Sequence, residues 1–260
     1  MSEMLRPLGI LCALPEEMRL LAAALDDRRD DERAGTKIAG GTLDGRRVVL
    51  AEGGIGKVGA ALAAMLLLDR FDCRALIFSG VAGGIDPQLG IGDIVIGERL
   101  VQHDYGAVVG EQAIAFRAGA FPLGEPAEDP AFVLDGKLAR ALKTALGDYV
   151  PPFLSASVLG MAEGRQPRLV FGTIVTGDRF VNSAAMRLRL SETWQAQAVE
   201  MEGAAVAQVA ARFGVPAVVI RALSDLAGAE SHMDFGRFLD IASTAAADVV
   251  RRVLAAISTS

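Results

Sequence analysis

The feature that most constrains the fold of this chain is the regular alternation of two hydrophobic patterns along its 260 residues. Short apolar runs such as Leu8–Leu14 and Leu169–Val175 have the length and composition of buried strands. Between such runs lie stretches such as Lys57–Asp69 and Gly203–Arg212, whose apolar residues recur every three or four positions, as on one face of a helix. This alternation is typical of an α/β protein, in which helices cover a central sheet.

The two patterns predict a set of elements. We expect strands at Leu8–Leu14, Lys37–Leu43, Arg46–Ala51, Ala75–Ser79, Asp93–Ile96, Phe153–Leu159, Leu169–Val175, Ala198–Glu200 and Ala217–Arg221. We expect helices at Glu16–Leu25, Lys57–Asp69, Leu138–Leu146 and Gly203–Arg212, and a closing helix that follows Asp234 as its N-cap. Asp44-Gly45 predicts a hairpin turn, because this dipeptide tolerates positive φ at both central positions. Loops are expected for the charged segment Asp26–Arg33 and for the Gly- and Pro-rich stretch from Gln102 to Asp135.

Composition and charge favour one globular domain over residues 1–260. Hydrophobic residues make up 52% of the chain and charged residues 22%, and no repeat, low-complexity segment or linker divides it. The net charge of −6 argues against a nucleic-acid partner, because binding to phosphates requires a basic face.

The N-terminal segment and the cysteines bear on location. The first apolar run is stopped by Pro15-Glu16-Glu17, so it is too short for a signal peptide or a membrane span. Cys12 and Cys73 lie in apolar runs without a metal-type or redox-type spacing, which indicates reduced thiols in a reducing compartment. We therefore expect a cytoplasmic protein with no membrane partner.

Glycine clusters and carboxylates follow six of the predicted strands. In open α/β sheets, ligands bind beyond the carboxyl ends of the strands, so these residues form a candidate site, and we expect them all to open on one edge of the sheet. They are Glu16-Glu17, Gly53–Gly56, Gly80–Gly84, Thr176–Asn182, Met201-Glu202 and Ser224-Asp225. Taken singly, each has a structural explanation: Glu17 as a first-turn helix acid, Glu202 as a helix start, Asp225 as a turn cap and the glycines as tight turns. Their convergence favours a binding site.

Patterns for common cofactors fail in detail. The glycines of Gly54–Gly59 match the dinucleotide fingerprint, but they follow the second arm of a hairpin, and the next strand ends in Ser79-Gly80 without an acid to hold a ribose. In Gly56–Val58, the hydroxyl residue that a P-loop needs for magnesium is missing. The only histidines, His103 and His232, lie far apart, so no zinc site is expected. We expect neither a cofactor nor a metal.

The chain resembles the purine and uridine phosphorylase superfamily and, within it, the 5′-methylthioadenosine/S-adenosylhomocysteine nucleosidases. The most specific matches are Ala198-Val-Glu-Met-Glu-Gly203 and Arg221-Ala-Leu-Ser-Asp225, supported by Gly53-Gly-Ile-Gly-Lys-Val58, the Gly80–Gly84 turn and Thr176-Gly-Asp-Arg-Phe-Val-Asn182. The resemblance runs from about Leu8 to Leu254. It implies a three-layer α/β/α domain with a central mixed, twisted sheet. It also implies hydrolysis of the N-glycosidic bond of 5′-modified adenine nucleosides to adenine and the free modified ribose.

The resemblance implies roles for individual residues. Asp225 matches the acid that protonates purine N7, with Ser224 helping to hold it, and Glu17 matches the carboxylate that activates the attacking water. Glu202 matches the residue that binds the ribose hydroxyls. The other substrate contacts that it implies are Met201 beneath the sugar, Phe180 stacked on the base, the backbone of Val181 at the base edge, Phe235 in the 5′ pocket, and Ile55, Gly83 and Glu200.

These residue types also suit glycosidic cleavage on chemical grounds. Breaking the N9–C1′ bond makes the ribose resemble an oxocarbenium ion, which nearby anionic groups stabilise. Adenine leaves poorly as an anion, so a carboxylic acid that stays protonated in a sheltered site assists its departure. Each proton transfer of this kind typically contributes about 10² to 10⁴ in rate.

Two departures from the family pattern keep alternatives open. Val81 stands where the nucleosidases carry a small polar residue beside the ribose, and the 100–135 segment lacks the usual loop at the 5′ pocket. The alternatives are a nucleosidase for another 5′-modified purine nucleoside (futalosine or adenosylhopane), a purine nucleoside phosphorylase, an NAD-binding oxidoreductase and a catalytically silent nucleoside-binding protein. The carboxylates of Glu16-Glu17 would repel phosphate, which favours water as the nucleophile.

The helix predicted at Lys57–Asp69 bears on assembly. Its segment Ala60–Leu68 is apolar on more sides than one sheet face can cover, and the resembled family is dimeric. We therefore expect a homodimer.

Overall fold

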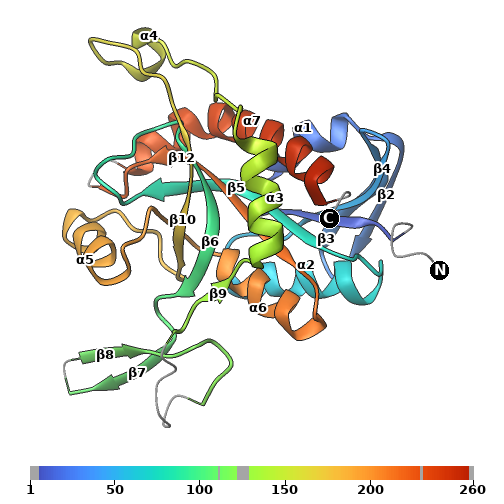
Figure 1. Cartoon of the computed structure of the whole chain (residues 1–260), viewed down its shortest axis with the longest axis horizontal. Helices are drawn as coiled ribbons and strands as arrows, with labels where there is room; N and C mark the ends of the chain where they lie inside the picture. Colours follow the sequence, from blue (N-terminus) through green and yellow to red (C-terminus); the bar gives the residue numbers. More distant parts are fainter. Residues whose placement is uncertain (1–5, 111, 122–128, 229–230, 258–260) are drawn as a thin grey trace.

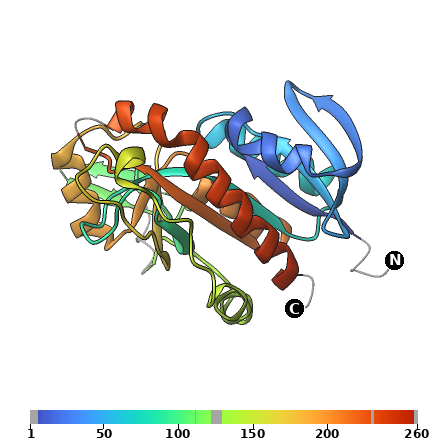
Figure 2. The same cartoon turned by 90° about the horizontal axis from the view of Figure 1, so that it is seen from above.

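A ten-stranded sheet lies between two layers of helices in the computed structural model, which describes residues 6–110, 112–121, 129–228 and 231–257 (Figure 1, Figure 2). The strands run in the order β11-β10-β6-β12-β5-β1-β4-β3-β2, and β9 pairs with β6. They are β1 (Leu8–Cys12), β2 (Asp26–Arg33), β3 (Thr36–Leu43), β4 (Arg46–Glu52), β5 (Leu76–Gly84), β6 (Ile94–Gln102), β9 (Phe132–Val133), β10 (Leu169–Thr176), β11 (Ala198–Glu200) and β12 (Ala217–Asp225). The expected three-layer fold with a mixed sheet is confirmed.

The central strands are buried on both faces, so their sequences are continuously apolar. All five residues of β1 are buried, because β4 and β5 flank it in parallel and helices cover it above and below. Ile10 packs into one hydrophobic core and its neighbour Leu11 into the other. Val218 and Val219 of β12 divide between the two cores in the same way.

Helices form the two outer layers. On one face, α1 (Pro15–Ala23) and α3 (Gly136–Leu146) pack against the long α7 (Ser231–Ile257), which crosses β5 and β12 (Figure 2). On the other face, α2 (Lys57–Asp69) packs against α6 (Gly203–Phe213). Two further helices, α4 (Ala156–Leu159) and α5 (Ala184–Trp194), lie outside these layers (Figure 1). No helix in the described ranges is both long and apolar enough to cross a membrane.

The sheet contains two sets of strands that run in opposite directions. Strands β1, β4, β5 and β12 are parallel to one another, and so are β6, β10 and β11, but β12 meets β6 antiparallel. The expectation that all six strand ends share one edge of the sheet is therefore wrong for a flat sheet. Because β11 also pairs with β5, the strands β5, β12, β6, β10 and β11 close into a ring. This closure brings the ends of β10 and β11 to the side of β12.

Most predicted elements lie where the sequence places them. Helix α2 and strand β11 have the predicted bounds, and the Asp44-Gly45 hairpin joins β3 to β4 with φ of 50° and 76°. Strands β5, β6 and β12 continue beyond their predicted ends, so the Gly80–Gly84 segment is part of β5 and not a turn. Cys12 and Cys73 are buried free thiols, as expected.

The segment Asp26–Arg33 is a strand and not the expected loop. It pairs antiparallel with β3 although all eight of its residues are exposed, so main-chain hydrogen bonds and not side-chain burial hold it in the sheet. Its charges suit an outer strand, because charged side chains discourage further edge-to-edge pairing.

Three other predictions also need correction. Phe153–Leu159 is not a strand: Leu154 makes one isolated bridge to Arg165, and the Ser155 hydroxyl then caps the short helix α4. The segment from Gln102 to Asp135 contains a hairpin, β7 (Gly106–Val109) with β8 (Gln112–Ala115), which projects from the body of the molecule (Figure 1). Asp234 lies in the first turn of α7 and is not its N-cap, because the helix begins three residues earlier at Ser231.

Candidate active site

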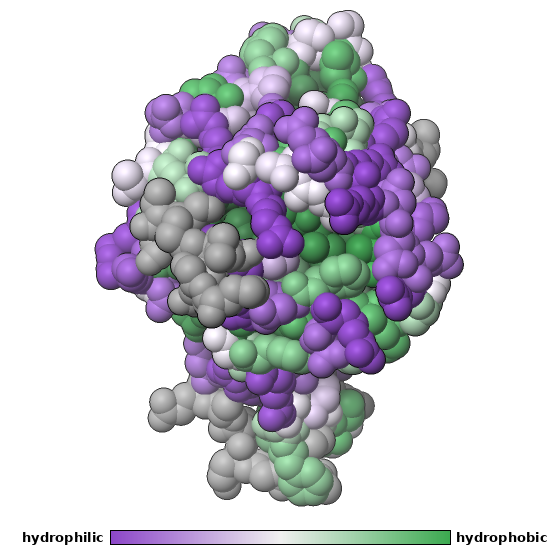
Figure 3. Space-filling model, turned by 90° about the vertical axis from the view of Figure 1, so that its right-hand side faces the viewer, coloured by the Kyte–Doolittle hydropathy of each residue, from purple (hydrophilic) through white to green (hydrophobic). Residues whose placement is uncertain are grey.

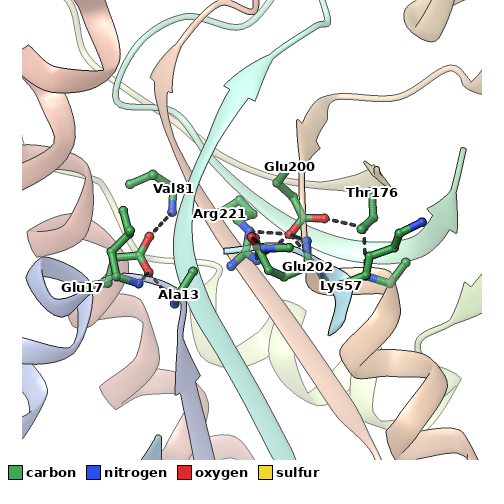
Figure 4. Close-up of polar contacts among 12 residues, drawn as sticks. Ala13, Glu17, Lys57, Val81, Thr176, Glu200, Glu202 and Arg221 are labelled. Carbon is green, nitrogen blue, oxygen red and sulfur yellow. Dashed lines mark hydrogen bonds and ion pairs between the residues drawn. The ribbon is translucent and has the colours of Figure 1, made fainter. Parts of the chain in front are cut away.

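Glu17 is a buried carboxylate held by three backbone N–H groups. It occupies the third position of α1, and its Oε2 accepts hydrogen bonds from Ala13 N at 2.8 Å and Leu14 N at 3.0 Å, donors that the helix leaves unpaired. Its Oε1 accepts from Val81 N of β5 at 3.0 Å (Figure 4). Burial raises the pKa of Glu17, although the Arg221 guanidinium and these hydrogen bonds act in the opposite direction. The helix-acid explanation is therefore correct, but Glu17 also reaches the central strand.

Arg221 is the centre of a buried ion network that sequence analysis did not assign to the site. Its side chain is 1% exposed within β12, its guanidinium carbon lies 4.0 Å from the centroid of the Phe78 ring, and its Nε and Nη2 donate to Glu200 Oε2 at 3.1 and 2.5 Å. Nη2 also lies 3.7 Å from Glu202 Oε2 (Figure 4). An arginine inside an otherwise apolar strand was the signal that could have identified it.

Both oxygens of Glu200 are already bound by the protein. Besides Arg221, Oε2 accepts hydrogen bonds from the backbone N–H groups of Glu202 and Gly203, and Oε1 accepts one from the Thr176 hydroxyl. The Thr176 oxygen in turn accepts from Ala204 N at 2.9 Å. Glu200 therefore orients Arg221 and the start of α6.

Glu202 lies directly beside this network. It is 5% exposed, and its Oε1 accepts a hydrogen bond of 2.7 Å from Gly56 N, at the start of α2. Burial, together with the negative charge of Glu200, raises the pKa of Glu202 from 4.5 to about 7, with Arg221 opposing the shift.

Asp225 ends β12 in a sheltered position. It is 2% exposed, its Oδ1 accepts from Ala227 N at 2.8 Å, and the hydroxyl of the fully buried Ser224 donates to its Oδ2 at 3.1 Å. Gly83 of β5 lies against it, since a Cβ at that position would be only 2.9 Å from Asp225 Oδ1. At Gly80, three residues earlier, a Cβ would meet Glu17 Oε1 at 2.7 Å and Arg221 Nη1 at 3.0 Å. These glycines allow the charged groups to approach the strand.

The remaining predicted residues provide less polar walls. Phe180 is 49% exposed and meets Phe235 of α7 edge to face, with ring centroids 6.1 Å apart. Val181 is buried, Met201 is half-buried between Glu200 and Glu202, and Ile55 is 63% exposed beside Gly56. Within the described residues, no group of three His, Cys, Asp or Glu side chains could hold a metal ion.

The site can therefore supply buried carboxylates around one guanidinium, with an aromatic pair nearby. Glu17, Glu200 and Glu202 surround Arg221, so the local charge is negative or neutral according to protonation. Such an environment stabilises a cationic transition state. It holds no free cluster of basic groups for a large anion among the residues just described.

Comparison with known proteins connects this arrangement to a family. A family model described as "Phosphorylase superfamily" matches residues 7–255. The 5′-methylthioadenosine/S-adenosylhomocysteine nucleosidase of Mycobacterium bovis is 45% identical over 95% of this chain and 96% of its own length. Among solved structures, the nucleosidase of that name from Colwellia psychrerythraea, in complex with adenine, has a TM-score of 0.78 and 34% identity, covering 96% of this chain and 95% of its own. The futalosine hydrolase of Helicobacter pylori has a TM-score of 0.77 and 30% identity, covering 98% and 99%.

The raised pKa of Glu202 predicts a dependence of stability on pH. A carboxyl group whose pKa is higher in the folded protein contributes stability that is fully present below its unfolded value and is lost as the pH rises through its folded value. For Glu202 that window runs from 4.5 to about 7. We expect Glu202→Gln to gain, relative to the parent, on the order of 2 kcal/mol of unfolding free energy between pH 5 and pH 8. Urea unfolding at both pH values measures this, with Glu192→Gln on the exposed face of α5 as the control; an unchanged difference would contradict the assignment.

Proposed function

The chain belongs to the phosphorylase superfamily, and we propose that within it the protein is an N-glycosyl hydrolase of 5′-modified adenine nucleosides. Its substrates are 5′-methylthioadenosine and S-adenosylhomocysteine, and its products are adenine and the free modified ribose. The names of the relatives support this substrate class, and the whole chain, residues 1–260, serves as one catalytic domain. Release of adenine from methylthioadenosine alone, without phosphate or NAD, is the direct test.

The observation that carries the proposal is the placement of two buried carboxyl groups along one strand. Glu17 lies at Gly80 of β5 and Asp225 at Gly83, and three residues of extended strand span about 10 Å. A separation of this order leaves room for a substrate and a water molecule between an acid and a base. Both groups are sheltered from solvent, which strengthens their electrostatic effect.

Asp225 is the acid that protonates N7 of the departing adenine. Its Oδ1 is fixed by Ala227 N and its Oδ2 by Ser224, so the carboxyl group keeps one orientation. Phe180 and Phe235 form an aromatic wall for the base and the 5′ substituent, and the backbone of Val181 reads the base edge.

Glu17 is the base that orients and deprotonates the attacking water. Burial raises its pKa, which makes the carboxylate a stronger base near neutral pH. Glu202 binds the ribose hydroxyls, with Met201 beneath the sugar. Ile55 and Gly83 complete the contacts, while Glu200 acts by holding Arg221 and the segment that carries Glu202.

The same contacts favour hydrolysis over phosphorolysis. A phosphorylase must hold a phosphate dianion next to C1′, which calls for free arginines or free backbone N–H groups. Here the Val81 N–H is bound to a carboxylate, and Nε and Nη2 of Arg221 are bound to Glu200. A phosphate near Gly80 would face Glu17 directly.

A homodimer is the assembly that the surface of α2 supports. The helix buries Ala60, Ala63, Ala64 and Leu67, but Val58, Leu62 and Met65, spaced as on one helix face, are 82%, 38% and 42% exposed. Further apolar surface lies on the projecting β7–β8 hairpin, where Val108 and Val109 are 77% and 61% exposed, at the lower end of the molecule in Figure 3. The two buried free thiols support a reducing, cytoplasmic location.

We predict that Asp225→Asn loses a factor of about 10² or more in kcat, because the amide keeps the shape of the side chain but cannot deliver a proton. Substrate binding should survive. Steady-state adenine release and binding of adenine by calorimetry measure the two effects. Asp240→Asn, which changes an exposed aspartate of α7, is the control. Near-parental kcat in Asp225→Asn would show that another group is the acid.

Phosphate should not accelerate the reaction, and the sugar product should be the free modified ribose. Glu17→Ala should lower the rate by roughly 10² or more, because it removes the base that activates water. Product analysis with and without phosphate separates the two reactions. Ribose 1-phosphate as the main product, with a rate that saturates in phosphate, would establish a phosphorylase instead.

Light scattering at micromolar concentration should give the mass of a dimer. Leu62→Lys should shift the protein toward monomer, because it places a charge on the apolar stripe of α2. Val150→Lys, at an equally accessible apolar residue outside α2, should not. A monomeric parent protein rules out this assembly.

A further inference from the structure

Three charged residues from separate elements form a closed ring beside the site. Lys57, the first residue of α2, donates from Nζ to Asp104 Oδ1 at 2.6 Å. The other oxygen of Asp104 accepts from Asp178 N at 2.9 Å, and Asp178 Oδ1 accepts from Lys57 N at 2.8 Å. Asp104 follows β6, and Asp178 follows β10. The ring therefore joins three segments that are far apart in the sequence.

Each side of the ring leads directly to a substrate-binding residue. Gly56, next to Lys57, donates its N–H to Glu202, and a Cβ at Gly56 would lie 3.2 Å from Asp178 Oδ1. Phe180 stands two residues after Asp178. The ring thus fixes the loop that holds the ribose-binding carboxylate relative to the loop that carries the base-stacking ring.

The local physical chemistry makes these contacts strong for a site near the surface. Gly56, the N-cap of α2, has no side chain, so Asp178 supplies the missing cap from another element. The Lys57 side chain is only 17% exposed, so its charge is partly shielded from solvent. Burial alone would raise the pKa of Asp104, but the hydrogen bonds from Lys57 and Asp178 N outweigh it, and the pKa is lowered. The ring is therefore ionised at neutral pH.

We propose that Lys57, Asp104 and Asp178 are positioning residues that set the distance between the base-binding and ribose-binding groups of this enzyme. The inference rests on the proposed function for the roles of Glu202 and Phe180. The three residues touch neither base nor sugar in this scheme. They act on substrate affinity and on recognition of the ribose hydroxyls, and not on the proton transfers at Asp225 and Glu17.

The test compares variants that open the ring with one that keeps its geometry. Asp178→Ala and Lys57→Met should raise KM for methylthioadenosine about tenfold, equivalent to about 1.4 kcal/mol, and change kcat much less. Their preference for the ribo substrate over the 2′-deoxy substrate should fall, because Glu202 loses its fixed position. Asp178→Asn keeps the oxygen that accepts from Lys57 N, so its KM should stay near the parental value. Lys143→Met, which opens the Lys143–Glu98 ion pair on α3, controls for the loss of a surface charge pair.

Hydrogen exchange provides a readout that needs no catalysis. In Lys57→Met and in Asp104→Asn, amides in residues 53–58 and 177–182 should exchange faster together, while the Lys143→Met variant should match the parent. If the parent protein releases no adenine, the proposed function fails, and exchange still decides whether the ring couples the two loops. If the parent is active and the ring variants keep its KM, its ribose preference and its exchange rates, the ring has no positioning role. Ring variants that differ from the parent in thermal stability alone would equally overturn that role.

Discussion

The buried ion pair between Arg221 and Glu200 is the interaction on which the rest of the site depends. A guanidinium 1% exposed in the middle of a sheet is costly unless every donor finds a partner. Glu200 supplies most of that compensation, and its remaining bonds to Thr176 and to the start of α6 tie β10, β11 and β12 together. Removing either partner would leave the other charge buried and unpaired. The positions of Glu202 and Glu17 follow from this pair, because both lie within the electrostatic reach of Arg221.

Closure of the sheet explains how these groups meet at all. Strands β10 and β11 run opposite to β12, so in a flat sheet their carboxyl ends would lie at the other edge. The antiparallel pairing of β11 with β5, through Val199 with Gly83 and Ala198 with Gly84, bends the sheet back on itself. Gly83 therefore serves two purposes: it pairs with β11 and leaves room for Asp225. The mixed topology is thus a condition for the site.

Local patterns predicted what depends on local residues. The bounds of α2, the Asp44-Gly45 turn and the buried β1 follow from periodicity and turn chemistry, and the resemblance supplied the mixed three-layer architecture. The charged strand β2 was missed because its stability comes from main-chain pairing to β3, which leaves no hydrophobic pattern. The closed ring of strands was also beyond reach, because a three-residue strand such as β11 does not specify its two partners. For the site, the carboxylates at strand ends were found as candidates, but Arg221 was not, because its importance lies in contacts with residues distant in sequence.

The charge balance around Arg221 is better matched to a transition state than to the empty site. Burial raises the pKa of both Glu17 and Glu202, so the folded protein holds their negative charges at a cost. One arginine only partly offsets three carboxylates. A ribose ring that gains positive charge as the glycosidic bond breaks supplies the missing counter-charge and favours ionisation of both groups. Because backbone N–H groups and Arg221 already fix these carboxylates, little reorganisation is needed when that charge develops. The same feature that weakens the resting site therefore strengthens its interaction with an oxocarbenium-like sugar.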